Sequence, residues 1–303
     1  MPVLSPVPRA SGLLSAMVTP LGPDGRLDTA ALGRYLPWLA ARGVDGVFLA
    51  GTTGEGPLLS VLERRRLLEA TLAVARPLGL RVVAHVGAAT TRAARQLARH
   101  AAAAGADAVA AVTPWFYGLD AAALADHFAA VAEAAAGVPF FLYNIPQAAR
   151  NRVTPELVAA VAQRVPNLAG LKDSQGEGAV LASLVAAGRA ACPGGFAVFC
   201  GGDGLALEAL EAGADGIVSG NASTVPEPFA DLLHAFRAGD LAAARQAQAR
   251  IDAVRQALRH GADIGLYKAA LAARGVPVGP PRPPLPSRGV EEAAAALAAI
   301  GLG

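Results

Sequence analysis

Lysine is nearly absent from this sequence, although positively charged residues are not. The chain of 303 residues holds 26 lysine and arginine residues, of which only Lys172 and Lys268 are lysines, so the other 24 are arginines. Arginine stays protonated in proteins, whereas an amine can lose its proton and act as a nucleophile. A lysine retained in such a chain is therefore a candidate for a chemical role, and the alternative is chance retention at the surface.

Cysteine, charged residues and long apolar runs are also scarce. Cys192 and Cys200 have neither metal-ligand spacing nor the pattern of a disulfide framework, and the five histidines form no ligand motif, so we expect no metal. The net charge of +2 is too small for a general nucleic-acid-binding protein. The amino terminus lacks the features of a signal peptide, and charges, Gly or Pro interrupt every apolar stretch before it reaches membrane-spanning length. We expect a cytoplasmic protein without nucleic-acid or membrane partners.

Short apolar runs alternate with alanine- and leucine-rich segments of helical length. The runs are continuously apolar or β-branched, which is typical of strands buried on both faces of a parallel sheet. Eight strand–helix pairs predict an α/β protein with a closed (β/α)₈ TIM barrel. The alternative, an open doubly wound sheet, would favour a glycine-rich phosphate loop after the first strand, and Thr19–Pro23 is a poor one. The expected strands are Leu13–Val18, Gly46–Ala50, Arg81–Val86, Ala108–Thr113, Pro139–Tyr143, Leu168–Lys172, Phe196–Cys200 and Gly216–Ser219.

The helical segments divide the chain into a barrel and an extension. Residues 1–225 are expected to form the barrel core through the eighth strand, and residues 226–303 the last barrel helix plus a C-terminal helical appendage. Several segments begin at a capping residue such as Ser60, Thr90 or Asp120. The expected helices are Thr29–Ala41, Ser60–Arg76, Thr90–Ala104, Ala121–Ala135, Thr154–Arg164, Val180–Ala190, Leu205–Ala212, Glu227–Ala238, Leu241–Arg259, Ile264–Arg274 and Val290–Ile300.

Lys172 is the most informative residue at a strand end, where the chemistry of such barrels takes place. It closes the apolar run Leu168–Leu171, so its stem should lie inside the barrel. Desolvation disfavours the charged form of a buried lysine, which makes its amine a nucleophile toward a carbonyl. The alternative is a structural lysine paired with Asp173 or Glu55, and strand position alone favours neither reading.

Two other strand ends carry polar groups suited to the same chemistry. The glycines of Gly51–Gly54 allow a tight turn, and its hydroxyls and N–H groups could bind a carboxylate, although an ordinary strand–helix turn would look the same. Tyr143 could shuttle a proton, or could be a core aromatic residue with a satisfied hydroxyl. We expect His85 to be a satisfied core residue, Lys268 to be a surface or interface cation, and the remaining histidines to lie at the surface. These are His100, His127, His234 and His260.

Three motifs, taken in order and spacing, resemble the dihydrodipicolinate synthase / N-acetylneuraminate lyase family. They are Gly51-Thr52-Thr53-Gly54-Glu55, Tyr143-Asn144-Ile145-Pro146 and Gly170-Leu171-Lys172-Asp173, and the resemblance runs from Gly12 to about Pro286. It implies a homotetrameric, pyruvate-dependent class I aldolase or lyase, assembled as a dimer of dimers. It also implies small-molecule 2-oxo acid and aldehyde substrates, and no metal or organic cofactor beyond the covalent Schiff base.

The resemblance also implies roles for individual residues. Lys172 matches the Schiff-base lysine, and Tyr143 matches the tyrosine that assists proton transfer. Thr52 and Thr53 match the residues that hold the carboxylate of the 2-oxo acid, and Thr52 also matches a proton-relay hydroxyl. The rest of the expected substrate-binding set is Gly51, Gly201, Ser219, Gln147, Phe116 and Tyr117.

The specificity positions depart from the synthases that make the lysine precursor. Those enzymes have an arginine five residues after the tyrosine, where this chain has Ala148, and losing it should cost a few kcal/mol for a second carboxylate. Arg150 lies two residues away. Their relay tyrosine, which reaches a neighbouring subunit's site, corresponds to Phe116, with Tyr117 one residue further on.

Ala148 instead resembles the 2-keto-3-deoxy sugar acid aldolases, as does Pro281–Pro284. The leading hypothesis is therefore an aldolase or lyase for a 2-oxo-3-deoxy acid, and the alternative is a dihydrodipicolinate synthase with altered aldehyde recognition. A non-catalytic binding protein is a third hypothesis, against which the joint retention of lysine, tyrosine and both threonines argues. Residues available to hold a hydroxylated aldehyde are Gln147, Ser219, Asn221 and Ser223.

Overall fold

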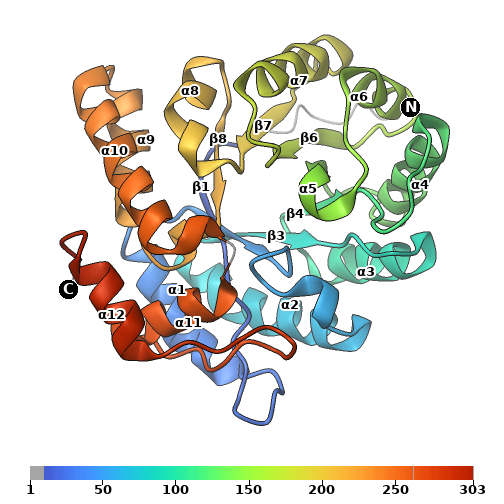
Figure 1. The fold of residues 1–303 in the computed structure, drawn as a ribbon. Helices are drawn as coiled ribbons and strands as arrows, with labels where there is room; N and C mark the ends of the chain where they lie inside the picture. Colours follow the sequence, from blue (N-terminus) through green and yellow to red (C-terminus); the bar gives the residue numbers. More distant parts are fainter. Residues whose placement is uncertain (1–9, 262, 303) are drawn as a thin grey trace. The chain divides into compact units, whose positions relative to one another are not determined.

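Eight strands form a closed barrel in sequence order, from β1 to β8, in the computed structural model, which describes residues 10–261 and 263–302 (Figure 1). With the alternating helices this is the predicted (β/α)₈ TIM barrel, followed by C-terminal helices. Each expected strand is present, with ends that differ by at most two residues. The strands are β1 Gly12–Ala16, β2 Gly46–Leu49, β3 Arg81–His85, β4 Ala108–Val112, β5 Phe140–Asn144, β6 Leu168–Asp173, β7 Ala197–Cys200 and β8 Gly216–Ser219.

The helices agree with the sequence pattern except in two places. The segment expected as one helix from Thr29 begins with a 3₁₀ turn, Thr29–Ala31, before the α-helix. A short helix, Pro146–Ala149, follows β5 and was not expected; Pro146 occupies its first turn, where proline is favourable. The helices are α1 Leu32–Ala40, α2 Val61–Ala75, α3 Thr91–Ala104, α4 Ala121–Ala134, α5 Pro146–Ala149, α6 Pro155–Ala162, α7 Gly178–Ala191, α8 Ala206–Glu211, α9 Glu227–Arg237, α10 Leu241–Ala257, α11 Ile264–Ala273 and α12 Val290–Ala298.

Capping side chains fix several helix starts where the sequence placed them. Ser60 and Glu63 form a reciprocal capping box at the start of α2. The side chains of Thr90 and Asp120 accept hydrogen bonds from backbone N–H groups in the first turns of α3 and α4. None of the helices in the described part of the chain is long and apolar enough to cross a membrane.

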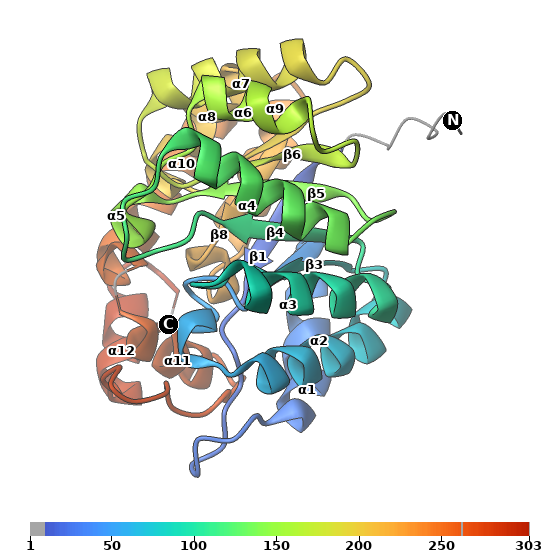
Figure 2. The ribbon, with the colours of Figure 1, turned by 90° about the vertical axis from the view of Figure 1, so that its right-hand side faces the viewer.

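The chain divides into two compact units, and the first comprises the residues through Gly12 and Val83–Ile217. In this unit α3 packs on α4, α4 on α6, and α6 on α7; Figure 2 shows α3 and α4 side by side. Edge-to-face packing of Phe128 on Phe140, with ring centroids 6.3 Å apart, joins α4 to β5. The parallel pairing of β5 with β6 places Tyr143 opposite Lys172 and Asn144 opposite Asp173.

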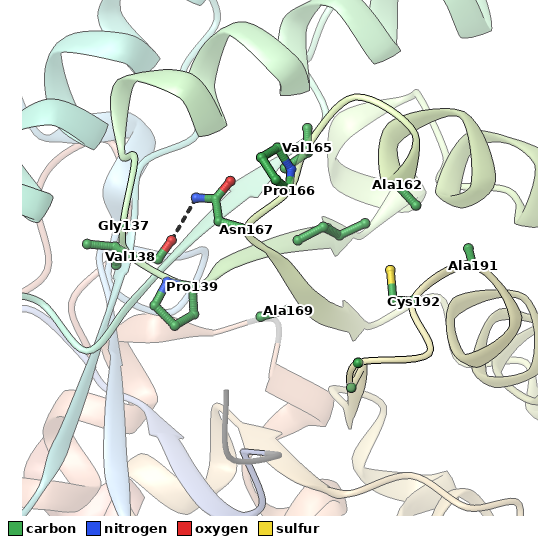
Figure 3. A pocket seen from close by; sticks show the side chains of 13 residues that line it. Gly137, Val138, Pro139, Ala162, Val165, Pro166, Asn167, Ala169, Ala191 and Cys192 are labelled. Carbon is green, nitrogen blue, oxygen red and sulfur yellow. Dashed lines mark hydrogen bonds between the residues drawn. The ribbon is translucent and has the colours of Figure 1, made fainter. Parts of the chain in front are cut away.

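A cavity of about 280 Å³ lies in the first unit near the amino ends of β5, β6 and β7 (Figure 3). Its lining is largely apolar and includes Val138, Val165 and Ala169, with Asn167 and Cys192 as the polar exceptions. The Asn167 amide donates to the carbonyl of Val138 at 2.7 Å. Because barrel chemistry takes place at the carboxyl ends of the strands, this cavity is not the candidate active site.

The second unit comprises Leu13–Val82 and Val218–Gly303. In it α9 packs on α10, α11 on α12, and α1 on α2. Tyr35 of α1 is fully buried, and its hydroxyl donates to the carbonyl of Ser223 at 2.8 Å. The Arg274 guanidinium contacts both Glu227 and the ring of Trp38, which lies 4.9 Å from it.

Candidate active site

Lys172 and Tyr143 form the centre of the candidate site in the first unit. They face each other across the β5–β6 pair, and both are buried, with exposed fractions of 5% and 2%. The lysine nitrogen lies 4.2 Å from the centroid of the Tyr143 ring, which is the geometry of a cation–π contact. The sequence-based expectation that the lysine stem is buried is confirmed.

Gly201 makes room for this lysine at the end of β7. A Cβ atom on Gly201 would lie 3.0 Å from Cε of Lys172 and 2.1 Å from Oγ of Ser174, which is too close for either neighbour. We expected Gly201 to contact substrate. In the structure its absent side chain provides space for the lysine stem.

A hydrogen-bonded pair behind the lysine links β5 to β6. Nδ2 of Asn144 donates to the Asp173 carboxylate at 2.7 Å, and Oδ1 of Asn144 accepts from the Val153 backbone N–H at 2.8 Å. The backbone N–H of Gln175 also donates to Asp173, at 3.4 Å. Burial raises the pKa of Asp173, and the hydrogen bond from Asn144 opposes that rise. These contacts fix the carboxyl ends of both strands.

Helix α5 carries Ala148, the position at which the resemblance to the lysine-pathway synthases would place an arginine. Gln147 and Ala148 are both exposed, and the Gln147 amide donates to the Ser174 carbonyl at 2.6 Å. This bond attaches α5 to the segment that follows Lys172. Arg150 directly after α5 is exposed and has a φ of 66°, a strained conformation for a residue other than glycine.

Phe116 and Tyr117 protrude from the loop after β4. Their exposed fractions are 74% and 71%, and their rings meet edge to face with centroids 5.1 Å apart. Asn151, which the sequence analysis did not single out, holds this loop by donating to the carbonyls of Pro114 and Tyr117 at 2.7 and 2.8 Å. A lone asparagine in a loop gives no sequence signal for such a role.

One of the two buried histidines of the first unit was predicted to be buried, and the other was not. His85 is a satisfied core residue as expected, since Nε2 accepts from the Val112 N–H at 3.3 Å and the ring packs edge-on against Tyr143. His127, however, was expected at the surface, and this was wrong: it is 4% exposed, and Nδ1 lies 2.9 Å from the Thr91 hydroxyl. Burial lowers the pKa of His127 to about 4.

The turn after β2 belongs to the second unit. Thr52 is exposed and Thr53 half-buried, whereas Gly51 and Gly54 are buried. A Cβ on Gly54 would lie 2.9 Å from the Ala50 backbone nitrogen, so the tight turn requires glycine there. A Cβ on Gly220 would lie 2.7 Å from Oγ1 of Thr53, so Gly220 makes room for this hydroxyl.

Lys268 is not the surface or interface cation that we expected. Its exposed fraction is 2%, and its nitrogen lies 2.7 Å from Oε1 of Glu55. Burial lowers the pKa of Lys268, and the Glu55 carboxylate opposes that shift. Glu55, considered above as a partner of Lys172, is thus paired with the second lysine of the chain.

The polar residues at and just after the end of β8 are engaged inside the second unit. Ser219 is fully buried, and its hydroxyl accepts from the Ala222 N–H at 3.0 Å. Asn221 is also buried, and accepts from the Tyr267 hydroxyl at 2.8 Å. Among residues 10–261 and 263–302, no group of three or more His, Cys, Asp or Glu side chains is arranged to hold a metal ion.

The chain is similar to several known proteins. The model of the dihydrodipicolinate synthetase family matches residues 9–300. The 4-hydroxy-tetrahydrodipicolinate synthase of Acidiphilium cryptum is 40% identical over 242 residues, which cover 79% of this chain and 80% of that protein. YagE, an Escherichia coli K12 prophage protein of the dihydrodipicolinic acid synthase family solved in complex with pyruvate, superposes with a TM-score of 0.90 at 28% identity, covering 97% of this chain and 99% of YagE. The sialic acid aldolase of Ruminococcus gnavus superposes with a TM-score of 0.89 at 28% identity, covering 97% of both chains.

Proposed function

Because the chain belongs to the dihydrodipicolinate synthetase family, we propose that it cleaves and forms a carbon–carbon bond in a 2-oxo-3-deoxy acid such as 2-keto-3-deoxygluconate. The chain is a class I aldolase or lyase of this family. The observation that carries the proposed chemistry is the buried lysine nitrogen 4.2 Å from the Tyr143 ring centroid, on neighbouring strands in register. The pyruvate bound to YagE supports a 2-oxo acid as the substrate class.

The proposed reaction begins at the amine of Lys172. In the synthetic direction its neutral nitrogen attacks the keto carbon of pyruvate, and water leaves to give an iminium ion. The iminium withdraws electrons, so a proton leaves the adjacent methyl group and an enamine forms. The enamine carbon attacks an aldehyde, and hydrolysis of the new imine releases the product and the free lysine. Cleavage follows the same steps in reverse.

Tyr143 is proposed to carry the protons of these steps. Carbinolamine breakdown and aldol cleavage each need a proton moved at an oxygen atom beside the imine, and a positioned phenol can donate and accept it. The edge-to-face contact with His85 and the burial of both rings hold the phenol in one orientation. Preorganised groups of this kind avoid the cost of reorientation during the reaction.

Thr52 and Thr53 are proposed to bind the carboxylate of the 2-oxo acid, with Thr52 as the relay hydroxyl. The support is the match of Gly51–Glu55 to the family motif and the exposure of the Thr52 side chain. The further substrate contacts proposed are those of Gly51, Gly201, Ser219, Gln147, Phe116 and Tyr117. A homotetramer without metal or organic cofactor, working in the cytoplasm, completes the proposal.

The choice of a hydroxylated aldehyde rests on Ala148. A second carboxylate, as in aspartate semialdehyde, would favour an arginine at this exposed position of α5, and alanine offers it no partner. Gln147, held by its bond to the Ser174 carbonyl, retains an amide oxygen that can accept from a hydroxyl. The second candidate, a 4-hydroxy-tetrahydrodipicolinate synthase, is favoured by the name of the Acidiphilium cryptum relative.

Borohydride reduction in the presence of pyruvate tests the chemistry. Intact mass should increase by one pyruvyl group per chain in the wild type and remain unchanged in Lys172→Ala. Wild-type protein without an adduct would contradict the enzymatic proposal and favour the non-catalytic reading.

Substrate preference requires a separate comparison. We expect kcat/KM for cleavage of 2-keto-3-deoxygluconate to exceed that for condensation of pyruvate with aspartate semialdehyde. A large preference for the semialdehyde would overturn the leading assignment in favour of the synthase, even if the adduct forms.

A further inference from the structure

We propose that the buried ion pair of Lys268 and Glu55 holds the turn Gly51–Gly56 in the conformation that binds the substrate carboxylate. This inference rests on the proposed carboxylate-binding role of Thr52 and Thr53. The two side chains are 1% and 0% exposed, and Nζ lies 2.7 Å from Oε1. Replacing a buried ion pair by apolar groups is often neutral or stabilising, so stability alone does not account for it.

The Glu55 carboxylate is held on both oxygens by the C-terminal segment. Oε1 receives the Lys268 ammonium group, and Oε2 accepts from the backbone N–H of Arg282 at 2.6 Å. The ammonium group also donates to the carbonyl of Pro280 at 2.9 Å. The Arg282 side chain in turn donates to the carbonyl of Leu58, two residues beyond the turn, at 3.1 Å. Residues remote in sequence thus hold the turn from its buried side.

Backbone hydrogen bonds within the turn link Glu55 to the segment that carries the two threonines. The N–H of Glu55 donates to the carbonyl of Thr52 at 3.1 Å, and the N–H of Gly56 donates to that of Gly51 at 3.0 Å. Glu55 has a φ of 57° and Ala50 a φ of 52°, both in the left-handed region that is unfavourable for residues other than glycine. Such conformations persist only where surrounding contacts impose them, and the anchored carboxylate of Glu55 provides such a contact for Glu55 itself.

The identity of Lys268 fits this role. The chain uses arginine at 24 of its 26 basic positions, yet retains lysine here. A compact ammonium group can lie between a carboxylate and a carbonyl, whereas a planar guanidinium group is larger and presents its donors in a fixed fork. Lys268 lies on helix α11, whose residues are buried from Ile264 to Leu271, so a larger guanidinium group would have to be accommodated away from solvent.

The test measures how tightly the turn holds pyruvate, not only whether the protein folds. The readout is the pyruvate concentration at which borohydride traps half of the maximal adduct, with the adduct detected by intact mass. The thermal midpoint of each variant is measured in parallel. Lys268→Met should raise this concentration at least about tenfold, while the adduct at saturating pyruvate remains one per chain because Lys172 is unchanged. Lys268→Arg should also raise the half-saturating concentration, since arginine keeps the positive charge but does not fit the site of the ammonium group.

The double variant Glu55→Gln/Lys268→Met separates positioning from stability. Removing both charges avoids an unpaired buried ion, so its thermal midpoint should lie above those of the single variants. Its half-saturating pyruvate should nevertheless stay raised, because the anchor is lost. If Lys268→Met does not fold, this variant and Lys268→Arg carry the test.

Arg274→Met is the matched control. It breaks the ion pair of Arg274 with Glu227 elsewhere in the same unit, and should lower the thermal midpoint without changing half-saturation. Half-saturation within twofold of wild type in the double variant, or an equal rise in the control, would overturn the positioning role alone. Wild-type protein that forms no adduct would instead reject the proposed function, and this inference with it.

Discussion

Gly201→Ala should slow imine formation by displacing Lys172, the lysine proposed to form the imine. The added Cβ would lie 3.0 Å from Cε of Lys172, whereas ordinary contacts begin at 3.4 Å, so the stem must retreat by a few tenths of an ångström. A misplacement of about 1 Å at a reacting group can cost on the order of a hundredfold in rate, and a smaller displacement costs correspondingly less. We expect the second-order rate constant for the pyruvate adduct to fall by about tenfold, or roughly 1.4 kcal/mol in barrier.

Two variants separate the contact with the lysine from the overlap with Ser174. The Cβ of Gly201→Ala would also lie 2.1 Å from Oγ of Ser174 and 3.2 Å from the carbonyl oxygen of Asp173. The double variant Gly201→Ala/Ser174→Ala removes the overlap with Ser174 and leaves Lys172 as the nearest side chain. It should remain slow. Gly202→Ala is the control, because its Cβ would meet only Gly176, at 3.4 Å or beyond, which is ordinary contact.

The assay is time-resolved borohydride trapping with intact-mass detection at several pyruvate concentrations, with thermal midpoints measured in parallel. Gly202→Ala should react at the wild-type rate. A Gly201→Ala variant that forms the adduct as fast as the wild type would refute the claim that this glycine makes room for the lysine.

Other variants address specificity, proton transfer and stability. Ala148→Arg should raise kcat/KM for aspartate semialdehyde by about tenfold or more, since a charge-assisted bond contributes about 1.5–3 kcal/mol, and no gain would contradict our account of α5. Tyr143→Phe should lower kcat by about a hundredfold or more while still permitting a slow adduct; near-normal turnover would remove Tyr143 from proton transfer. His127 has a folded pKa of about 4, below its ordinary 6.5, so the unfolded chain binds the proton first. The free energy of unfolding should therefore be unaffected by His127 above pH 6.5 and should fall by up to about 3 kcal/mol as the pH is lowered from 6.5 to 4. In His127→Phe the denaturation midpoint should depend less on pH across that range.

The barrel could be predicted from the sequence because its strands are short, apolar and buried on both faces. Such runs, separated by capped helical segments, leave few alternatives to a parallel α/β fold. The position of Lys172 at the end of one apolar run likewise predicted a buried stem, which the structure confirms. Helix α5 could not be predicted, because four residues are too few to show helical periodicity.

Partners that lie far apart in the chain were decided only by tertiary structure. Nothing local to Lys268 indicates that Glu55 is its counter-ion, although the apolar residues all around α11 were a sign of burial. His127 follows the same pattern, because its burial depends on how α4 packs against neighbouring elements.

The sequence by itself determined the order of strands and helices and the turn glycines, because these depend on local periodicity and backbone sterics. It also predicted Lys172 as the reactive amine. Tertiary structure decided which charges meet away from water and which glycine leaves space for the lysine. Those outcomes depend on the packing of segments that are distant in sequence, and local patterns do not encode it.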